Sequence, residues 1–148
     1  MKLIFTKGSG KTDQLDIYNG SAAKQTLMSP KQRIIPHEMV HYAVEHTLQQ
    51  RGFLHRVRDG EAATFTMAPE AEADGVERLV EVFQGDAWSG SSSAAADMIE
   101  MYRVTCNARA CPMLAVDEAA IEAVRTYMKE LSEKWDAVTV GQSLELVL

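Results

Sequence analysis

Both ends of the chain alternate apolar and polar residues, which is typical of β-strands that bury one face. The turn-forming pair Asn19-Gly20 lies within the first of these regions. We expect two or three antiparallel strands in residues 2–28 and a closing strand in residues 143–148 that joins the same sheet. The apolar positions that define these strands are Leu3, Phe5, Leu15, Ile17, Leu144, Leu146 and Leu148.

Apolar residues at helical spacing fill the region between the terminal strands. Pro36 suits the first position of the first helix, and Gly52 suits its end. Residues 51–67 resemble an extended segment with a turn at Asp59-Gly60, and the glycine- and serine-rich residues 85–93 are expected to form a mobile loop that could serve as a lid. The sequence therefore predicts a single α+β domain with about four helices, at residues 36–50, 70–84, 93–110 and 117–138.

The composition argues against several classes of partner. The chain has 148 residues and a formal net charge of −6, and its lysines and arginines are scattered. Such a chain offers no clustered positive field, so we expect neither nucleic acid nor an anionic membrane as a partner. Its start lacks the apolar core of a signal peptide, and no stretch approaches the roughly 20 apolar residues of a membrane span.

Two cysteines bear on the cellular compartment. Cys106 and Cys111 are five residues apart in a stretch that resembles a helix, where their side chains would point to different sides. This spacing suits neither a metal-binding Cys-x-x-Cys pair nor an easy disulfide. We therefore expect reduced thiols and a cytoplasmic protein, with association into a homo-oligomer left open.

The first predicted helix carries the pattern His-Glu-x-x-His at residues 37–41. Because residues four apart on a helix lie about 6 Å from one another, His37 and His41 could bind one metal ion through their ring nitrogens. His37 falls in the first turn, where the helix dipole favours neutral imidazole, the form that binds metal. The same dipole favours the carboxylate of Glu38, which could take a proton from an attacking water.

Three further glutamates are candidates for the surroundings of this pair. Glu45 lies too far from His37 along the helix for one ion to bind both, so we expect it to accept a hydrogen bond that orients His41. A third metal ligand would come from the second helix, where Glu77 and Glu81 are the better candidates. The alternative is that both histidines are half-buried and hydrogen-bonded without any metal, since this short pattern also arises by chance.

The pattern resembles the active helix of the zincin metallopeptidases. That resemblance covers residues 37–41 and their helix, and it implies zinc bound by His37 and His41 with Glu38 as the general base. The chain departs from the metzincin extension, because Val44 and Thr47 stand where that class has glycine and histidine. It also lacks an evident gluzincin ligand, since Glu61 has about the right separation but falls in a predicted loop.

The longer string PHEMVHYAVE is similar to that of small uncharacterised bacterial proteins with P-H-[DE]-x-x-H-x-x-V-E after a short β region. The likeness extends to Trp135, Gly141 and Leu144 near the end of the chain. It implies that His37 and His41, together with Glu45, are the characteristic positions. It also implies that aspartate can replace Glu38, which would weaken a role as general base.

Two hypotheses of function follow from these residues. The first is a zinc-dependent hydrolase that acts on a peptide or small-molecule substrate, the peptide bond being suggested only by analogy. The second is a non-enzymatic interaction or structural domain, in which the histidine pair and Glu45 form a structural metal site or a polar network. Metal content and the effect of replacing Glu38 would distinguish the two.

Overall fold

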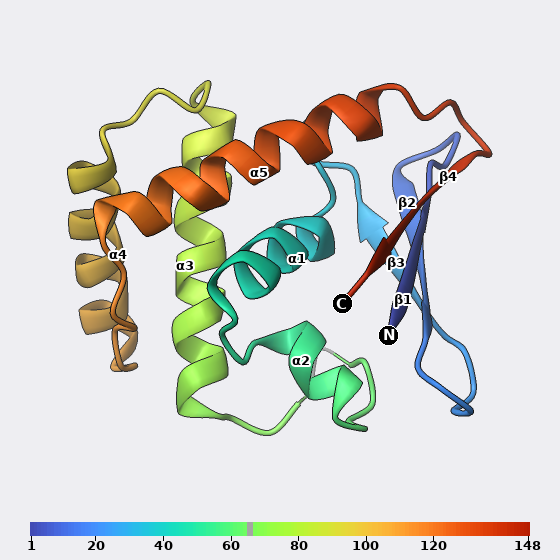
Figure 1. Cartoon of the computed structure of the whole chain (residues 1–148), viewed down its shortest axis with the longest axis horizontal. Coiled ribbons are helices and arrows are strands. Elements are labelled where there is room, and N and C mark those ends of the chain that lie inside the picture. Colours follow the sequence, from blue (N-terminus) through green and yellow to red (C-terminus); the bar gives the residue numbers. More distant parts are fainter. Residues whose placement is uncertain (65–66) are drawn as a thin grey trace.

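The computed structural model describes residues 1–64 and 67–148, and it has the predicted α+β architecture. Within these described residues, four strands form one antiparallel sheet in the order β3-β2-β1-β4. Their bounds are Lys2–Thr6 for β1, Thr12–Tyr18 for β2, Gln25–Pro30 for β3 and Ser143–Val147 for β4. The strand near the end of the chain therefore joins the N-terminal sheet as expected, and it pairs with β1 (Figure 1).

Alternation along the strands gives the sheet one buried face. Leu3 in β1 lies opposite Ile17 in β2 and opposite Leu146 in β4, and all three side chains are buried. Phe5 and Leu15 form the next buried pair along the same strands. Because side chains alternate between the faces with a period of two, this register places the apolar set of each strand against the helices.

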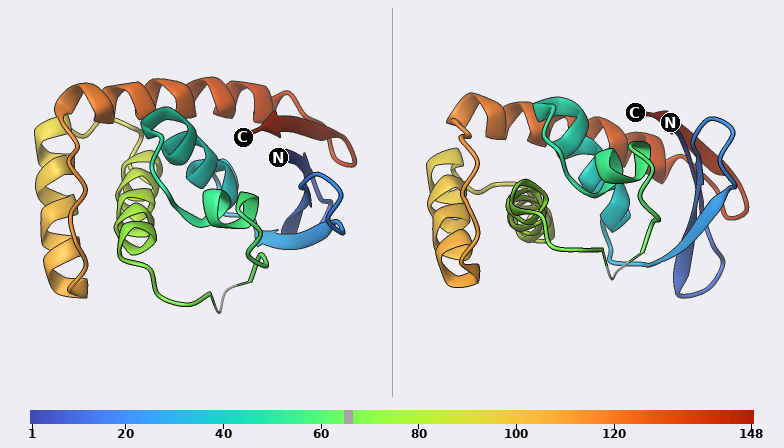
Figure 2. Two further views of the ribbon diagram at one scale, coloured as in Figure 1. Left: turned by 60° about the horizontal axis from the view of Figure 1, so that its bottom comes forward. Right: turned by 90° about the horizontal axis from the view of Figure 1, so that it is seen from below.

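In residues 1–64 and 67–148, five helices lie on that side of the sheet, and α4 lies farthest from it. Helix α1 lies at the centre of the molecule and packs against both α3 and α5, so eight consecutive residues of α1, 38–45, are buried. Figure 2 shows the sheet at one end of the molecule and α4 at the other. The bounds are His37–Leu48 for α1, Phe53–Arg58 for α2, Ala71–Trp88 for α3, Ala95–Arg109 for α4 and Glu118–Asp136 for α5.

The predicted extended segment at 51–67 is wrong over residues 53–58, which form α2. The turn at Asp59-Gly60 is present, and residues 65 and 66 lie outside the described residues. Helix α2 forms because the buried carboxylate of Glu45 accepts hydrogen bonds from backbone amides at its start. Leu54 and Val57 then enter the core. Tertiary contacts thus decide the structure of a segment too short to be a stable helix alone.

Helix α1 ends two residues earlier than predicted, and the residue that terminates it is not the expected Gly52. Gln49 adopts the left-handed conformation that closes the helix, with φ 52°. Gly52 has a different role, because a Cβ there would lie 2.6 Å from Cδ of Glu45 and 2.6 Å from Cγ1 of Val76. Its missing side chain is what allows these two residues to pack against the start of α2.

The predicted mobile loop at 85–93 is wrong in its first half, because α3 continues to Trp88. The indole of Trp88 donates a hydrogen bond to the carbonyl of Gln32, at 2.7 Å, and Asp86 accepts one from the amide of Ser93, at 3.1 Å. Arg125 on α5 binds the carbonyl of Ser93 at 2.6 Å. These contacts anchor both the extra turn of α3 and the segment that follows it.

The two cysteines are free thiols, but they do not lie on different sides of one helix. Helix α4 ends at Arg109, and Ala110 adopts the left-handed conformation. The amide of Cys111 therefore turns back and donates to the carbonyl of Cys106, at 3.1 Å. Cys106 is buried and Cys111 is partly exposed. In the described part of the chain, no helix has both the length and the apolar character needed to cross a bilayer.

Candidate metal centre

The first turn of α1 presents the two histidines. Pro36 stands just before the helix, and its carbonyl accepts hydrogen bonds from the amides of Met39 and Val40. His37 and His41 follow one turn apart, with their ring centroids separated by 4.8 Å and their planes at 79°. His41 is buried, whereas about a third of the His37 side chain is exposed, so the pair spans the border of the core.

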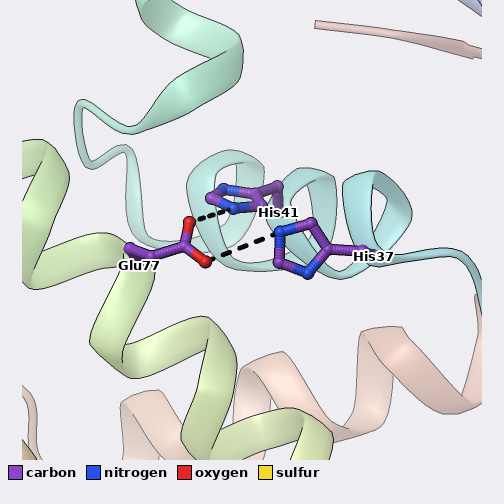
Figure 3. Close-up of side chains that lie close together, drawn as sticks. All are labelled: His37, His41 and Glu77. Carbon is purple, nitrogen blue, oxygen red and sulfur yellow. Dashed lines mark hydrogen bonds and ion pairs between the residues drawn. The ribbon is translucent and has the colours of Figure 1, made fainter. Parts of the chain in front are cut away.

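Both histidines point toward the same carboxylate of α3 (Figure 3). The Nε2 atom of His41 lies 2.7 Å from Oε2 of Glu77, and the Nε2 atom of His37 lies 3.5 Å from Oε1. One ligand atom from each of the three residues lies within 4.8 Å of the others. The His37, His41 and Glu77 group could therefore hold a metal ion, with Glu77 as the third ligand sought on the second predicted helix.

The other nitrogen of each ring has its own acceptor. The Nδ1–H group of His41 donates to Oε2 of Glu45, at 3.0 Å, as expected from the sequence. The Nδ1–H group of His37 donates to Oε1 of Gln84, at 2.9 Å, from the buried face of α3. Such contacts fix the orientation of an imidazole ring and direct its Nε2 toward a metal. Gln84 was not predicted; the only signal for it is its position seven residues after Glu77 on one helix face.

Glu45 is fully buried, and its two oxygens serve several donors besides His41. They accept hydrogen bonds from the amides of Gly52, Leu54 and His55, at 2.9 to 3.1 Å. They also accept one from Nδ1 of His55, at 2.9 Å. One carboxylate therefore orients a candidate metal ligand and satisfies the free amides at the start of α2.

The charges in this cluster depend on one another. Burial alone would lower the pKa of His41, but hydrogen bonds to Glu45 and Glu77 raise it to about 10. Burial alone would raise the pKa of both glutamates, but the contacts with His41 bring each to about 2. Without an ion, the two flanking carboxylates therefore favour the protonated ring of His41. A divalent cation at Nε2 would replace the proton as the positive charge beside Glu77.

Glu38 and Glu81, the remaining predicted residues, occupy different surroundings. Glu38 is buried and accepts a hydrogen bond from the hydroxyl of Ser29 on β3, and its side chain lines the same cavity as both histidines. Glu81 lies one turn beyond Glu77, where its carboxylate pairs with Arg78 at 2.9 Å. It is therefore not part of the group that could hold the ion.

A cavity of about 400 Å³ opens beside the histidines. Helices α1, α2 and α3 contribute to its wall, together with residues 64 and 67–69 between α2 and α3. Residues 85–93, the predicted lid, contribute to other hollows, near Arg125 and Met101, and are not among the residues that line this one. The residues that line the cavity are His37, Glu38, His41, Phe53, Arg56, Thr64, Met67, Ala68, Pro69, Ala73, Asp74 and Glu77.

Comparison with protein-family models, with curated proteins and with solved structures finds no match to this chain. The resemblance to zincins therefore rests on residues 37–41 and their helix.

Proposed function

We propose that the protein is a zinc-dependent hydrolase in which His37, His41 and Glu77 bind the metal ion. The observation that carries the proposal is the convergence of two Nε2 atoms on one carboxylate, while each Nδ1 atom is held by a buried acceptor. Two imidazoles and one carboxylate are the ligand set of many catalytic zinc sites. The same set also suits ferrous iron, so the identity of the metal is part of the test.

Two features favour a catalytic ion over a structural one. A structural zinc site is usually closed by four protein ligands, whereas the group found among the described residues has three. This group also borders a cavity large enough for a small substrate. An open coordination position facing a cavity is what a hydrolase requires.

Glu38 is the group that would move protons. Zinc, when bound, supplies a Lewis acid that polarises a substrate carbonyl and makes water a better nucleophile. The Glu38 carboxylate takes a proton from the attacking water, whose oxygen bonds to the carbonyl carbon. As the bond to the leaving nitrogen breaks, Glu38 delivers the proton to that nitrogen. The Ser29 hydroxyl holds one oxygen of Glu38, so the other is available for this exchange.

Elemental analysis of the purified protein tests metal binding directly. We expect about one transition-metal ion per chain in the wild type and none in His41→Ala. His46→Ala is the matched control, since His46 lies on the same helix but outside the group, and it should retain the ion. A wild-type protein that contains no such ion, and binds none when zinc is added, contradicts the proposal.

Glu38→Gln then separates catalysis from a structural role. The substitution keeps the size of the side chain and removes its capacity to accept a proton. Loss of amide or ester hydrolysis in a panel of small substrates, with the metal retained, supports the hydrolase. Full metal occupancy without any hydrolysis in the wild type would instead support a structural metal site.

A further inference from the structure

The wall of the cavity beside the metal group is acidic. Apart from the two histidines, three carboxylates contribute to it, from Glu38, Asp74 and Glu77, against one guanidinium, from Arg56. That guanidinium is already neutralised, because Glu61 lies 2.8 Å from its Nη2 atom and Glu70 lies 3.5 Å from its Nε atom. Its Nη2 atom also donates to the carbonyl of Ala68, at 2.7 Å. Arg56 therefore offers little to an anionic substrate.

Asp74 differs from the other two carboxylates of the wall. A bound metal ion would neutralise the carboxylate of Glu77, and the carboxylate of Glu38 already accepts a hydrogen bond from the Ser29 hydroxyl. Asp74 is exposed at the start of α3, and no cation or hydrogen-bond donor of the described residues pairs with its carboxylate. It lies three residues before Glu77 and thus on the same helix face, with the two Cβ atoms about 5–6 Å apart.

The rest of the wall is largely apolar. Phe53 from α2 lies beside His41, with ring centroids 5.8 Å apart, and Ala73 is buried next to Asp74. Met67 and Pro69 extend this surface along the connection before α3. A ligand bound against this wall would bury an apolar group, and the unpaired carboxylate of Asp74 would lie close to it, near the metal ligands.

We infer that the site takes substrates with a positively charged amino group close to the reacting carbonyl and an apolar group beside it. The ammonium pairs with Asp74, the apolar group packs on Phe53 and Met67, and the carbonyl lies at the His37, His41 and Glu77 group. This specificity rests on the proposed function, because it takes the metal ion as the reacting centre. Asp74 is then the residue that selects cationic over neutral or anionic substrates.

Three hydroxamates that differ only at the amino group test this specificity: leucine hydroxamate, its N-acetyl derivative and its N-succinyl derivative. All three carry the same metal-chelating group and apolar side chain, but the amino position is cationic, neutral or anionic. Calorimetry with zinc-loaded protein at slightly acidic pH keeps the free amine protonated. We expect the cationic probe to bind about tenfold more tightly than the neutral one, and the anionic probe to bind most weakly.

Asp74→Asn removes the charge and keeps the shape of the side chain, so it should abolish the preference while the protein retains its zinc. Asp97→Asn is the matched control, because Asp97 also lies in the first turn of a helix but faces another hollow, and it should retain the preference. Equal binding of the cationic and neutral probes, or a preference that survives Asp74→Asn, overturns this inference and leaves the hydrolase standing. If zinc-loaded protein binds none of the three probes, the proposed function fails and the inference fails with it.

Discussion

The side chain of His41 donates a hydrogen bond from Nδ1 to the buried carboxylate of Glu45, at a distance of 3.0 Å. The same carboxylate accepts hydrogen bonds from backbone amides at the start of α2. Helix α2 in turn contributes Phe53 and Arg56 to the cavity wall. The orientation of a candidate metal ligand and the position of the cavity wall therefore depend on one side chain. Substitutions of Glu45 should therefore affect both metal binding and the shape of the cavity.

Replacing Glu45 with alanine should destabilise the protein strongly. The substitution leaves buried amides of α2 and the ring of His55 without their acceptor, and it removes the partner of His41. Loss of one member of a buried charged network costs about 3–5 kcal/mol of unfolding free energy. Urea denaturation measures this loss, with Glu130→Ala on the exposed face of α5 as a control expected to change little. A loss similar to that of the control would contradict the role of Glu45.

Replacing Gln84 with alanine should weaken metal binding more than it weakens the fold. Its Oε1 atom is the acceptor that orients His37, and partners of this kind typically contribute about 10–100-fold to metal affinity. Competition with a chelating dye measures the zinc affinity of the variant. Gln84→Glu keeps an acceptor at this position and should restore most of the affinity. Equal affinity in Gln84→Ala and in the wild type would show that His37 needs no such partner.

Gly52→Ala should disturb both the fold and the metal group. The new methyl group would lie 2.6 Å from Cδ of Glu45 and from Cγ1 of Val76, so one of these buried groups must move. Overpacking of this kind costs about 1–3 kcal/mol, and a displaced Glu45 would also weaken zinc binding through His41. Thermal unfolding and zinc titration measure the two effects.

Gly10→Ala is the natural control for that substitution. A Cβ at Gly10 would meet nothing within 4 Å. We expect a change in stability within about 0.5 kcal/mol and unchanged zinc affinity. If the two glycine variants behave alike, Gly52 is not needed for the approach of Glu45 to α2.

The two thiols should react at very different rates. Burial, together with the neighbouring Cys111, raises the pKa of Cys106 to about 11, and only the thiolate is nucleophilic. Iodoacetamide at mildly alkaline pH should therefore modify the partly exposed Cys111 first, as judged by mass spectrometry. In urea both cysteines should react alike. Preferential labelling of Cys106 in the folded protein would contradict its buried environment.

The same thiol makes stability fall at high pH. Its pKa is higher in the folded chain than the ordinary value of 9.0, so the unfolded chain loses the proton first. The stability associated with the protonated thiol is therefore complete below pH 9.0 and is lost as the pH rises through about 11. Urea midpoints measured over this range should fall less steeply in Cys106→Ala than in the wild type.

Much of the fold could be predicted because its signals are local. Alternation at Leu3 and Phe5 and again at Leu144 and Leu146 defines strands whatever the rest of the chain does. The spacing of His37 and His41 likewise brings two rings together on any helix. Glu45 could be anticipated for the same reason, because it follows His41 by one turn.

What the sequence did not reveal depends on how helices pack. Gln84 reaches His37 only because α3 crosses α1 at a particular place, and the same crossing selects Glu77 over Glu81. Helix α2 was missed because the acceptor for the backbone amides at its start is Glu45, which lies on another helix. Gly52 looked like a helix terminator, although its role is to leave room for neighbours. None of these relationships has a periodic pattern along the chain.

The pairing of β1 with β4 has a consequence for how the protein folds. Leu3 contacts Ile17 soon after synthesis, but its other partner, Leu146, is separated from it by nearly the whole chain. The outer side of β1 therefore stays unpaired until every helix has been made, and such distant pairings are slow to form. Until β4 arrives, that open strand edge is the part of the nascent protein that most needs protection from aggregation.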